Sequence, residues 1–531
     1  MRVLFLVAML ALPVLATASE LDVLPLGDAG EAFELGSANP GEFYDAGRGT
    51  TVDLATMAGR MASADVVLLG EEHTAMDQKL LHAELLDAMA ASGAKLVLAM
   101  EFFQRDDRGA LDRWIGGEID ERQLLEETGW YDRGGYRWEY YRPVMEVARS
   151  HGIPVVGVNV PREIPRAVNR GGLDGLSDEQ RAEVGEVTTD GSPQHRYLIT
   201  RYFGDTVAML PPGWFDNMYA AQCLWDVVMA RSVLQVAAED VTVVLIVGSG
   251  HIAYDLGIPR RLADERAAAG EPPIDVVTLC PATAPAPPDD GEPTGHPMGG
   301  GGHQPGAEVG PPAQFSRSLA DFVAVFADRG GIEAFPTIGL KLKADDDEKP
   351  VVSIVFPDTL ASTVGFASGD RILDINGVEP ADLGEFRFLL AGIEWGQRLG
   401  IRVARGEESV EIAALLFPEV EVVDRTVAPG YVVEALDAIE PDSAVSVSTA
   451  VVPDDRARWS LVTDDGVPVR AEVRIDGVLE EVHELDDQGR VARSLYRQAR
   501  DGGVVEIRYE RDDSGAVVKA ASFDRTGDAV D

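Results

Sequence analysis

The chain has 531 residues, 45% hydrophobic and 26% charged, a composition typical of a globular protein long enough for several domains. Lys and Arg total 46 against 90 Asp and Glu, so the formal net charge is −44 at pH 7. A surface this acidic repels phosphates and anionic lipid, which excludes nucleic acid and anionic membrane as partners of the bulk surface.

The N-terminus has the three parts of a secretory signal peptide. Arg2 supplies the positive charge, residues 3–14 form the apolar segment, and residues 16–18 fit a cleavage site. We therefore predict a signal peptide over residues 1–18 and an exported protein, periplasmic or secreted. Association with the membrane through an uncleaved signal is the alternative, and no stable transmembrane span is expected elsewhere.

Residues 19 to about 50 form a mixed segment, which we interpret as an arm over the first domain. Beyond it, short apolar runs alternate with stretches of helical periodicity, and this alternation predicts an α/β domain with a mostly parallel sheet and flanking helices. The first helix is expected over 76–92. The strand-like runs are residues 66–69, 95–100, 153–159, 241–248 and 274–279.

Polar side chains stand where these runs end. Because the carboxyl ends of parallel strands share one edge of a sheet, we expect these side chains to meet in one crevice. Two histidines with carboxylates suit either a divalent metal or acid–base chemistry. The residues concerned are Glu71, Glu72 and His73 after the first run, Glu101 after the second, Asn159 after the third, and Gly250 and His251 after the fourth.

One hypothesis from these strand ends is a metal-dependent hydrolase, in which a metal activates water and a carboxylate acts as general base. The chain has no phosphate-binding GK[ST] loop, no G-x-S-x-G elbow and no H-E-x-x-H motif, so those enzyme classes are excluded. In this hypothesis the metal is held by His73, Glu101 and His251, and the catalytic residues are Glu72, His73, Glu101 and His251.

Aromatic residues crowd the segment 130–143, WYDRGGYRWEYYRP. Crowded aromatic side chains usually pack against one another. They can equally line the pocket of a flat apolar ligand, with a tyrosine phenolate as an iron ligand. Both interpretations remain open at this point.

Five pieces of the chain together resemble the motif series of the ChaN-like haem-binding family, related to the TraB/Tiki and erythromycin-esterase groups. They are VVLLGEEH, LAMEFF, YYRPVMEVARSHGIPVVGVNVPR, AAQCLWDVVMA and VVLIVGSGHIAYDLGIPRRL, and the resemblance covers roughly residues 50–280. The matching positions are Glu71, Glu72, His73, Glu101, Asn159, Arg162, Gln222, Asp226, Gly250 and His251.

The resemblance implies an α/β domain that handles haem or iron, with a tyrosine as iron ligand. Tyr131 and Tyr141 are the candidate ligands. The other cofactor-binding positions it implies are His73, Arg162, Gln222, Asp226, Gly250 and His251. Many members of the family are lipoproteins, and this chain departs from them because no cysteine lies near the cleavage site.

A linker rich in Pro and Gly follows at 281–313, and residues 316–330 are predicted as one helix. The segment 331–418 is similar to a PDZ domain. Ile338, Gly339 and Leu340 match its carboxylate-binding loop, GDRILDING at 369–377 matches its turn and strand, and 383–390 is the expected groove helix. The resemblance implies that a protein C-terminus or peptide binds there by strand addition.

The remaining segment, 425–531, is predicted as β-hairpins with turns at 486–489 and 512–515. We assign it no catalytic role. Cys223 and Cys280 are the two cysteines of the chain, and export permits a disulfide between them. Two buried free thiols are the alternative.

Overall fold

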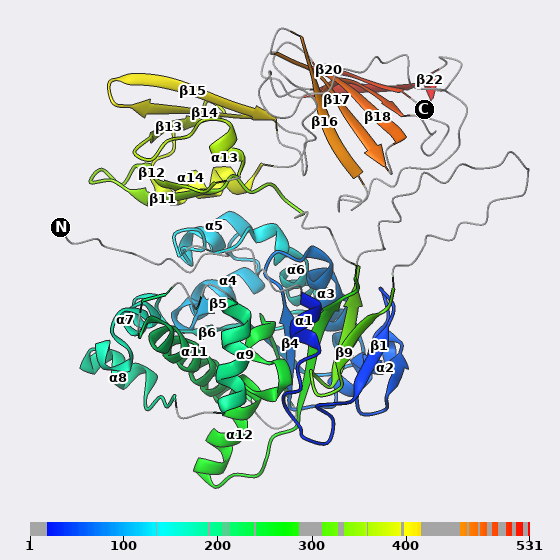
Figure 1. Ribbon diagram of the computed structural model, residues 1–531, viewed down its shortest axis with the longest axis vertical. Helices are drawn as coiled ribbons and strands as arrows, with labels where there is room; N and C mark the ends of the chain where they lie inside the picture. The colour runs from blue at the N-terminus through cyan, green and yellow to red at the C-terminus, as the bar shows by residue number, and fades with distance from the viewer. Residues whose placement is uncertain are drawn as a thin grey trace, which may run out of the picture. The chain divides into compact units, whose positions relative to one another are not determined.

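The computed structural model describes residues 18–133, 135–189, 192–204, 207, 210–211, 213–237, 241–285, 311–327, 334–357, 359–393 and 398–415, and strand segments between 457 and 530. The predicted signal peptide, most of the linker and the turns at 486–489 and 512–515 lie outside these residues. The chain divides into two compact units, residues 1–328 and 329–531 (Figure 1).

The first unit is built on an eight-stranded sheet. Its neighbouring strands from β10 to β6 run parallel, and β2 and β3 add an antiparallel edge. The predicted mostly parallel α/β fold is therefore confirmed. The order is β3 (Thr50–Val52), β2 (Phe43–Asp45), β10 (Phe322–Phe326), β8 (Val276–Thr283), β4 (Val66–Glu71), β7 (Thr242–Gly248), β5 (Leu96–Gln104) and β6 (Val155–Asn159).

The central strands β4 and β7 are buried along their whole length, as expected for strands covered on both faces. Helices flank the sheet in two groups, one built around α3 and α6 and the other around α11 and α7 (Figure 1). Their bounds are α2 (Leu54–Met61), α3 (Met76–Ala91), α4 (Arg108–Ile115), α5 (Glu121–Glu127), α6 (Arg142–His151), α7 (Glu163–Gly171), α8 (Asp178–Val184), α9 (Pro193–Phe203), α11 (Trp214–Val236) and α12 (Ile258–Ala269).

The helix predicted over residues 316–330 is wrong. The structure has β9 (Ala313–Ser316), which pairs with β1 (Leu35–Ala38), and then β10, which enters the main sheet beside β8. The short apolar run 322–326 forms a strand because it is inserted between β2 and β8, which bury it and supply its hydrogen-bonding partners. The α/β unit therefore continues past the linker instead of ending at residue 280.

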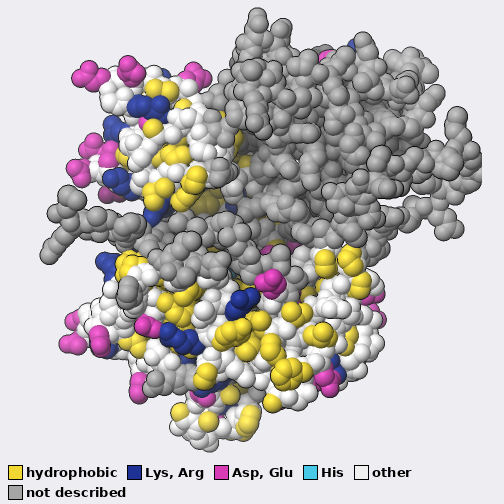
Figure 2. All heavy atoms as spheres, in the orientation of Figure 1, with side chains coloured by type: hydrophobic (Ala, Val, Ile, Leu, Met, Phe, Trp, Pro, Cys, Tyr) yellow, Lys and Arg dark blue, Asp and Glu magenta, His cyan; other side chains and the backbone are white. Residues whose placement is uncertain are grey.

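The second unit holds two antiparallel sheets, so the predicted β-rich character is confirmed. The first sheet has the order β11 (Leu340–Ala344), β12 (Pro350–Val355), β13 (Arg371–Ile375), β14 (Arg398–Arg405) and β15 (Glu408–Leu415), with helices α13 (Leu360–Thr363) and α14 (Leu383–Ala391). Helix α14 falls where the groove helix is predicted. On the face in Figure 2, acidic, basic and hydrophobic side chains are interspersed over this sheet.

The second sheet is a meander in which each strand pairs with the next along the chain. The two hairpins predicted from their turn sequences fall at β18–β19 and β20–β21, and both pairs are antiparallel. The strands are β16 (Ala457–Asp464), β17 (Val467–Ile475), β18 (Val478–Leu485), β19 (Val491–Tyr496), β20 (Glu506–Arg511), β21 (Val517–Phe523) and β22 (Ala529–Val530).

Both cysteines are buried free thiols. Cys223 lies in α11 and Cys280 in β8, and burial raises the pKa of the Cys223 thiol to about 11. Of the two alternatives for the cysteines, the structure has the free thiols.

Among the residues that the structure describes, no helix combines the length and apolar character that crossing a bilayer requires.

Candidate functional site

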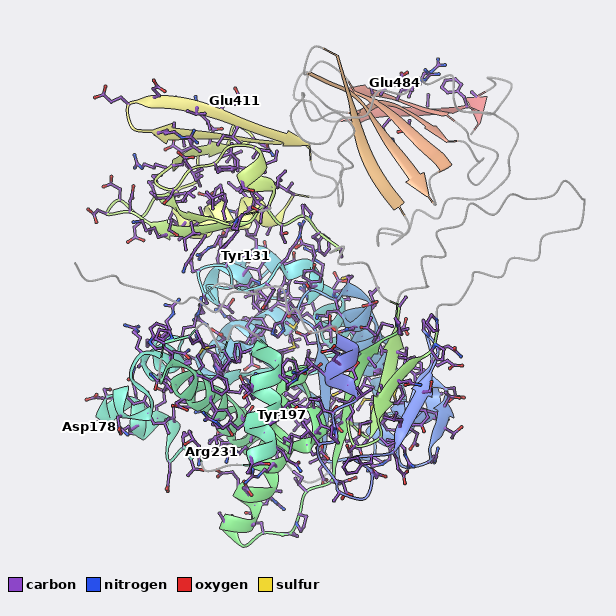
Figure 3. The ribbon with its side chains drawn as sticks, in the orientation of Figure 1. Tyr131, Asp178, Tyr197, Arg231, Glu411 and Glu484 are labelled. Atoms are coloured by element: carbon purple, nitrogen blue, oxygen red, sulfur yellow. The ribbon has the colours of Figure 1, made fainter. Side chains whose placement is uncertain are left out.

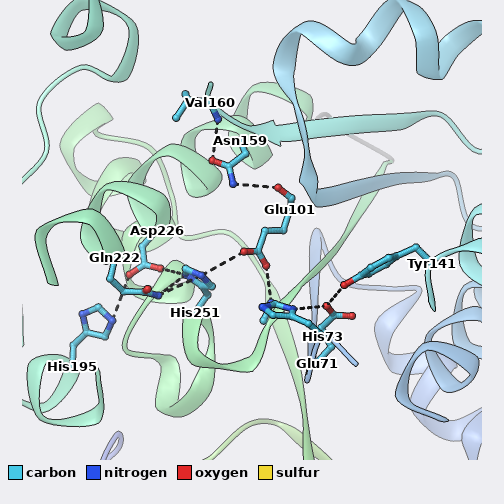
Figure 4. Close-up of polar contacts among 11 residues, drawn as sticks. Glu71, His73, Glu101, Tyr141, Asn159, Val160, His195, Gln222, Asp226 and His251 are labelled. Atoms are coloured by element: carbon cyan, nitrogen blue, oxygen red, sulfur yellow. Dashed lines mark hydrogen bonds and ion pairs between the residues drawn. The ribbon is translucent and has the colours of Figure 1, made fainter. Parts of the chain in front are cut away.

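Three neighbouring strands bring the predicted polar residues to one edge of the sheet. The order β4-β7-β5 places β7 between the other two, and Glu71 lies opposite Gly248 in the register. Residues that follow these strands therefore start side by side although they are far apart in sequence. The site has two halves, one around Glu71 and one around His251 (Figure 4).

Glu71 is the centre of the first half and is almost fully buried. Its Oε1 accepts a hydrogen bond from the Tyr141 hydroxyl at 2.8 Å and lies 2.9 Å from His73 Nδ1. Its Oε2 lies 2.7 Å from Nζ of the equally buried Lys79. Burial alone would raise the pKa of Glu71, but the charges of Lys79 and His73 outweigh it and lower the pKa to about 2. Glu71 is therefore an anion that orients the His73 ring.

His251 is the centre of the second half. Its Nδ1 lies 2.6 Å from Oδ1 of Asp226, a fully buried carboxylate, and 2.8 Å from Nε2 of Gln222. Asp226 and Gln222 are four residues apart on α11, so both come from one face of that helix, as predicted. Burial lowers the pKa of His251, but the hydrogen bond and the charge of Asp226 outweigh it, and the pKa is raised.

A second imidazole lies behind Asp226. Nε2 of His195, in α9, is 3.4 Å from Asp226 Oδ2, and its Nδ1 is 3.3 Å from the Tyr219 hydroxyl. Burial is the main cause that lowers the pKa of His195, which favours its neutral form. Asp226 is therefore placed between one imidazole that favours the charged form and one that favours the neutral form.

Glu101 and Gly248 join the two halves. Glu101 Oε2 accepts a hydrogen bond from the Gly248 N–H at 2.8 Å, and its Oε1 lies 3.7 Å from His251 Nε2. A Cβ atom on residue 248 would lie 2.9 Å from Cε1 of His73, so a glycine is needed for this close approach. Asn159 supports the junction because its side chain donates to the Glu101 carbonyl at 3.2 Å.

His73 is the part of the site that reaches the surface. Its side chain is 31% exposed, and its ring packs against Phe102 and Tyr136 at centroid distances of 5.2 and 4.7 Å, while those two rings also contact each other at 5.5 Å. Because Glu71 holds Nδ1, His73 can offer Nε2 to a ligand, an arrangement that metal-binding histidines commonly use.

The two tyrosines implied as iron ligands are both directed inward. Tyr141 has no exposed surface and donates its hydroxyl hydrogen to Glu71. Tyr131, which lies near α5 in Figure 3, accepts a hydrogen bond from the Trp138 N–H at 3.2 Å, and burial raises its pKa to about 12. Neither phenol is presented to a ligand in this conformation, whereas the neighbouring Tyr136 is half-buried beside His73.

Three other predicted residues lie outside the two carboxylate–histidine pairs. The Glu72 side chain is exposed, and its neighbour Glu71 supplies the carboxylate that contacts His73. Arg162 lines a separate hollow of about 370 Å³ with Arg133 and Arg166, beyond the end of β6. Gly250 lies beside the ring of Tyr202, and a Cβ there would be 3.6 Å from that ring, an ordinary packing distance, so the local geometry does not require a glycine.

The described part of the chain has no group of three or more His, Cys, Asp or Glu side chains that could hold a metal ion. The site expected from His73, Glu101 and His251 is therefore not a ready-made ligand set here. These side chains instead form carboxylate–histidine pairs.

Sequence reasoning missed Lys79, Phe102 and His195, and it included Tyr136 in the aromatic segment 130–143 without choosing it as a candidate ligand. Lys79 could have been recognised from its position on the buried face of α3, three residues before His82. A lysine in such a row requires a buried anion near it. His82 itself is also buried.

These features define an α/β protein with two linked carboxylate–histidine pairs at the carboxyl edge of its sheet. Residues 57–262 match the model of a family described as "Haem-binding uptake, Tiki superfamily, ChaN". The match supports a ChaN-like haem-binding domain in the first unit, as the sequence resemblance implies.

A curated protein and two solved structures show further similarity. RETICULATA-RELATED 5, a chloroplastic protein of Arabidopsis thaliana, is 23% identical over 221 residues, which are 38% of this chain and 30% of that protein. The chain thus matches less than a third of that relative's length.

Among solved structures, ChaN of Campylobacter jejuni, described as showing cofacial heme binding, has 16% identity and a TM-score of 0.40, over 53% of this chain and 95% of that one. The HtrA-type protease AlgW with a decapeptide has 26% identity and a TM-score of 0.15, over 16% of this chain and 29% of that one.

Proposed function

We propose that the first unit binds haem at the edge of the sheet where His73 reaches the surface. The observation that carries the proposal is the geometry of His73, whose Nδ1 is held by Glu71 while its ring packs in one cluster with Phe102 and Tyr136. Aromatic side chains suit the faces of a flat macrocycle, and haem, when bound, supplies an iron that takes nitrogen or phenolate ligands.

The chain's own residues also support this ligand electrostatically. Glu71 remains ionised because Lys79 lies beside it, so it favours the His73 tautomer that carries its hydrogen on Nδ1. In this proposal His73 and Tyr136 are the iron-ligand candidates, in place of Tyr131 and Tyr141. Tyr141 acts through Glu71 instead, as the third group that holds this carboxylate.

A titration of the purified full chain with hemin tests the proposal. We expect a Soret band that differs from that of free hemin, and we expect His73→Ala to weaken binding at least about tenfold, equal to the loss of about 1.4 kcal/mol. Tyr136→Phe should shift the band, and Tyr131→Phe should not.

His151→Ala is the matched control, because His151 is a partly exposed histidine at the end of α6 that pairs with Asp87. It should bind hemin like the unmodified chain. A spectrum identical to that of free hemin at all concentrations would contradict the proposal.

A second candidate is hydrolysis by acid–base catalysis, as in the esterase groups that the sequence resembles. The observation in its favour is the pair Asp226–His251 facing Glu101, because a carboxylate behind an imidazole is the arrangement of a general base. In this candidate function His251 acts without a bound metal. Glu71 and Asp226 take the carboxylate role that was predicted for Glu72.

We further propose that the segment 331–418 is a PDZ module that binds a protein C-terminus or peptide. Among the described strands of its sheet, β11 pairs only with β12, which leaves one edge for strand addition. Gly339, beside that edge, has φ +84°, and a Cβ there would lie 2.3 Å from Cβ of Thr359. These features favour the roles predicted for Ile338, Gly339 and Leu340.

Fluorescence anisotropy with a library of short peptides tests this module in the full chain. Peptides with a free C-terminal carboxylate should bind, and the same peptides with an amidated C-terminus should bind at least about tenfold more weakly. Equal binding of both forms would contradict the proposal.

Export of the chain, which its first residues predict, also remains part of the proposed function.

A further inference from the structure

The segment that starts at the last residue of the predicted signal peptide is packed into the first unit. We call residues 18–27 the N-terminal strap; it contains α1 (Ala18–Asp22). Leu21, Leu24 and Leu26 of the strap are buried in the core of the sheet. The Leu26 carbonyl accepts a hydrogen bond from the Ser318 hydroxyl at 2.5 Å.

The strap holds one side chain from the loop that carries His251. The hydroxyl of Tyr254 donates to the Leu21 carbonyl at 2.5 Å and accepts a hydrogen bond from the Leu24 N–H at 3.0 Å. Tyr254 is almost completely buried. Both hydrogen bonds span more than two hundred residues of sequence, so they connect the start of the chain directly to this loop.

The loop itself has an unusual backbone. Tyr254 and Asp255 have φ values of 61° and 56°, a region that residues other than glycine seldom adopt. The loop then closes on its own start, because a Cβ on Gly257 would lie 2.2 Å from the carbonyl oxygen of His251. A change in the backbone conformation at Tyr254 should therefore also move the backbone of His251.

We propose that the N-terminal strap is part of the His251 half of the site and that Tyr254 is a positioning residue. The strap clamps the Tyr254 hydroxyl, the clamp keeps residues 254 and 255 in their left-handed conformation, and the closed loop sets His251 against Asp226. The inference does not depend on which ligand the site binds.

Two measurements on the full chain test the proposal. Limited proteolysis reports release of the strap, and the ring Cε1–H signal of His251 in selectively labelled protein, at fixed pH and without ligand, reports the position of the imidazole. The signal is assigned by its loss in His251→Gln. Tyr254→Phe should increase cleavage within residues 18–27 several-fold and move the His251 signal.

Ser318→Ala provides a second variant, which removes the hydrogen bond to the Leu26 carbonyl and keeps the Tyr254 hydroxyl with both of its partners. It should produce the same two changes to a smaller extent. Tyr44→Phe is the matched control, because Tyr44 is a buried tyrosine of the same core that contacts Phe315 instead of the strap. It should change neither measurement.

Faster cleavage of the strap with an unmoved His251 signal would overturn the proposal, because the strap would then be a separate packing feature. Unchanged cleavage in both Tyr254→Phe and Ser318→Ala would overturn it as well, because the strap would be held by other contacts. Failure of hemin to bind would contradict the proposed function but leave this inference standing.

Discussion

Replacing Lys79 with methionine is expected to bring the first unit close to unfolding at neutral pH. The substitution leaves the carboxylate of Glu71 buried without its cation, and breaking a buried ion pair in this way costs about 3–5 kcal/mol. The free energy of unfolding of a domain is only about 5–15 kcal/mol, so the loss is a large fraction of it. Urea and thermal denaturation of the full chain measure the effect.

Lys95→Met is the matched control, because Lys95 is an exposed lysine directly before β5. It should change the free energy of unfolding by less than about 0.5 kcal/mol. Combining Lys79→Met with Glu71→Gln should recover part of the lost stability, since the buried charge is then removed with its partner. Equal stability of Lys79→Met and the unmodified chain would contradict this account of Glu71.

The same pair predicts acid sensitivity. The pKa of Glu71 is lowered from its ordinary value of 4.5 to about 2, so its contribution to stability is present above pH 4.5 and is lost as the pH falls toward 2. That difference corresponds to about 3 kcal/mol. In Lys79→Met this part of the acid destabilisation should shrink, because the native carboxylate has lost the charge that keeps it ionised.

Replacing Asp226 with asparagine is expected to lower the pKa of His251 below its ordinary value. In the unmodified chain Asp226 outweighs burial and raises that pKa, so the contribution of protonated His251 to stability is present at low pH and is lost as the pH rises through the raised pKa. Without the carboxylate, burial is opposed only by the charge of Glu101, the smallest of the causes that act on this ring, so burial prevails and favours the neutral form. An NMR titration of the labelled His251 ring measures the shift.

The Asp226 variant also separates the candidate functions. If the site hydrolyses esters by acid–base catalysis, turnover of an ester substrate should fall by about 10²–10⁴-fold in Asp226→Asn. Asp264→Asn, a half-exposed acidic residue of α12, should leave both the titration and the turnover unchanged. An unaltered His251 titration in Asp226→Asn would show that this carboxylate does not control the ring.

The strand ends of the site could be predicted because short apolar runs that stop at charged residues have one common explanation, a buried parallel sheet with a polar edge. Which of two adjacent carboxylates faces inward could not be predicted. β4 continues to Glu71, two residues past the apolar run, so Glu71 points into the core and Glu72 points out. This outcome depends on β7, which pairs with β4 as far as Gly248.

The direction in which each tyrosine hydroxyl points could not be predicted from the sequence either. Tyr141 and Tyr131 belong to an aromatic segment in which several phenols satisfy the same composition pattern, and only tertiary contacts decide where each hydroxyl goes. Lys79 and His195 were missed for a similar reason, because each acquires its role from a carboxylate on another element. The family resemblance located the motifs but could not supply these contacts.

The return of the chain to the sheet at β10 has a practical consequence for expression of the α/β unit alone. A fragment that stops at residue 280 would cut β8 short and leave it without the strand that covers its outer side. An uncovered apolar strand invites pairing with other molecules, so such a fragment should aggregate. Fragments for crystallisation or biophysical work should therefore extend through residue 327.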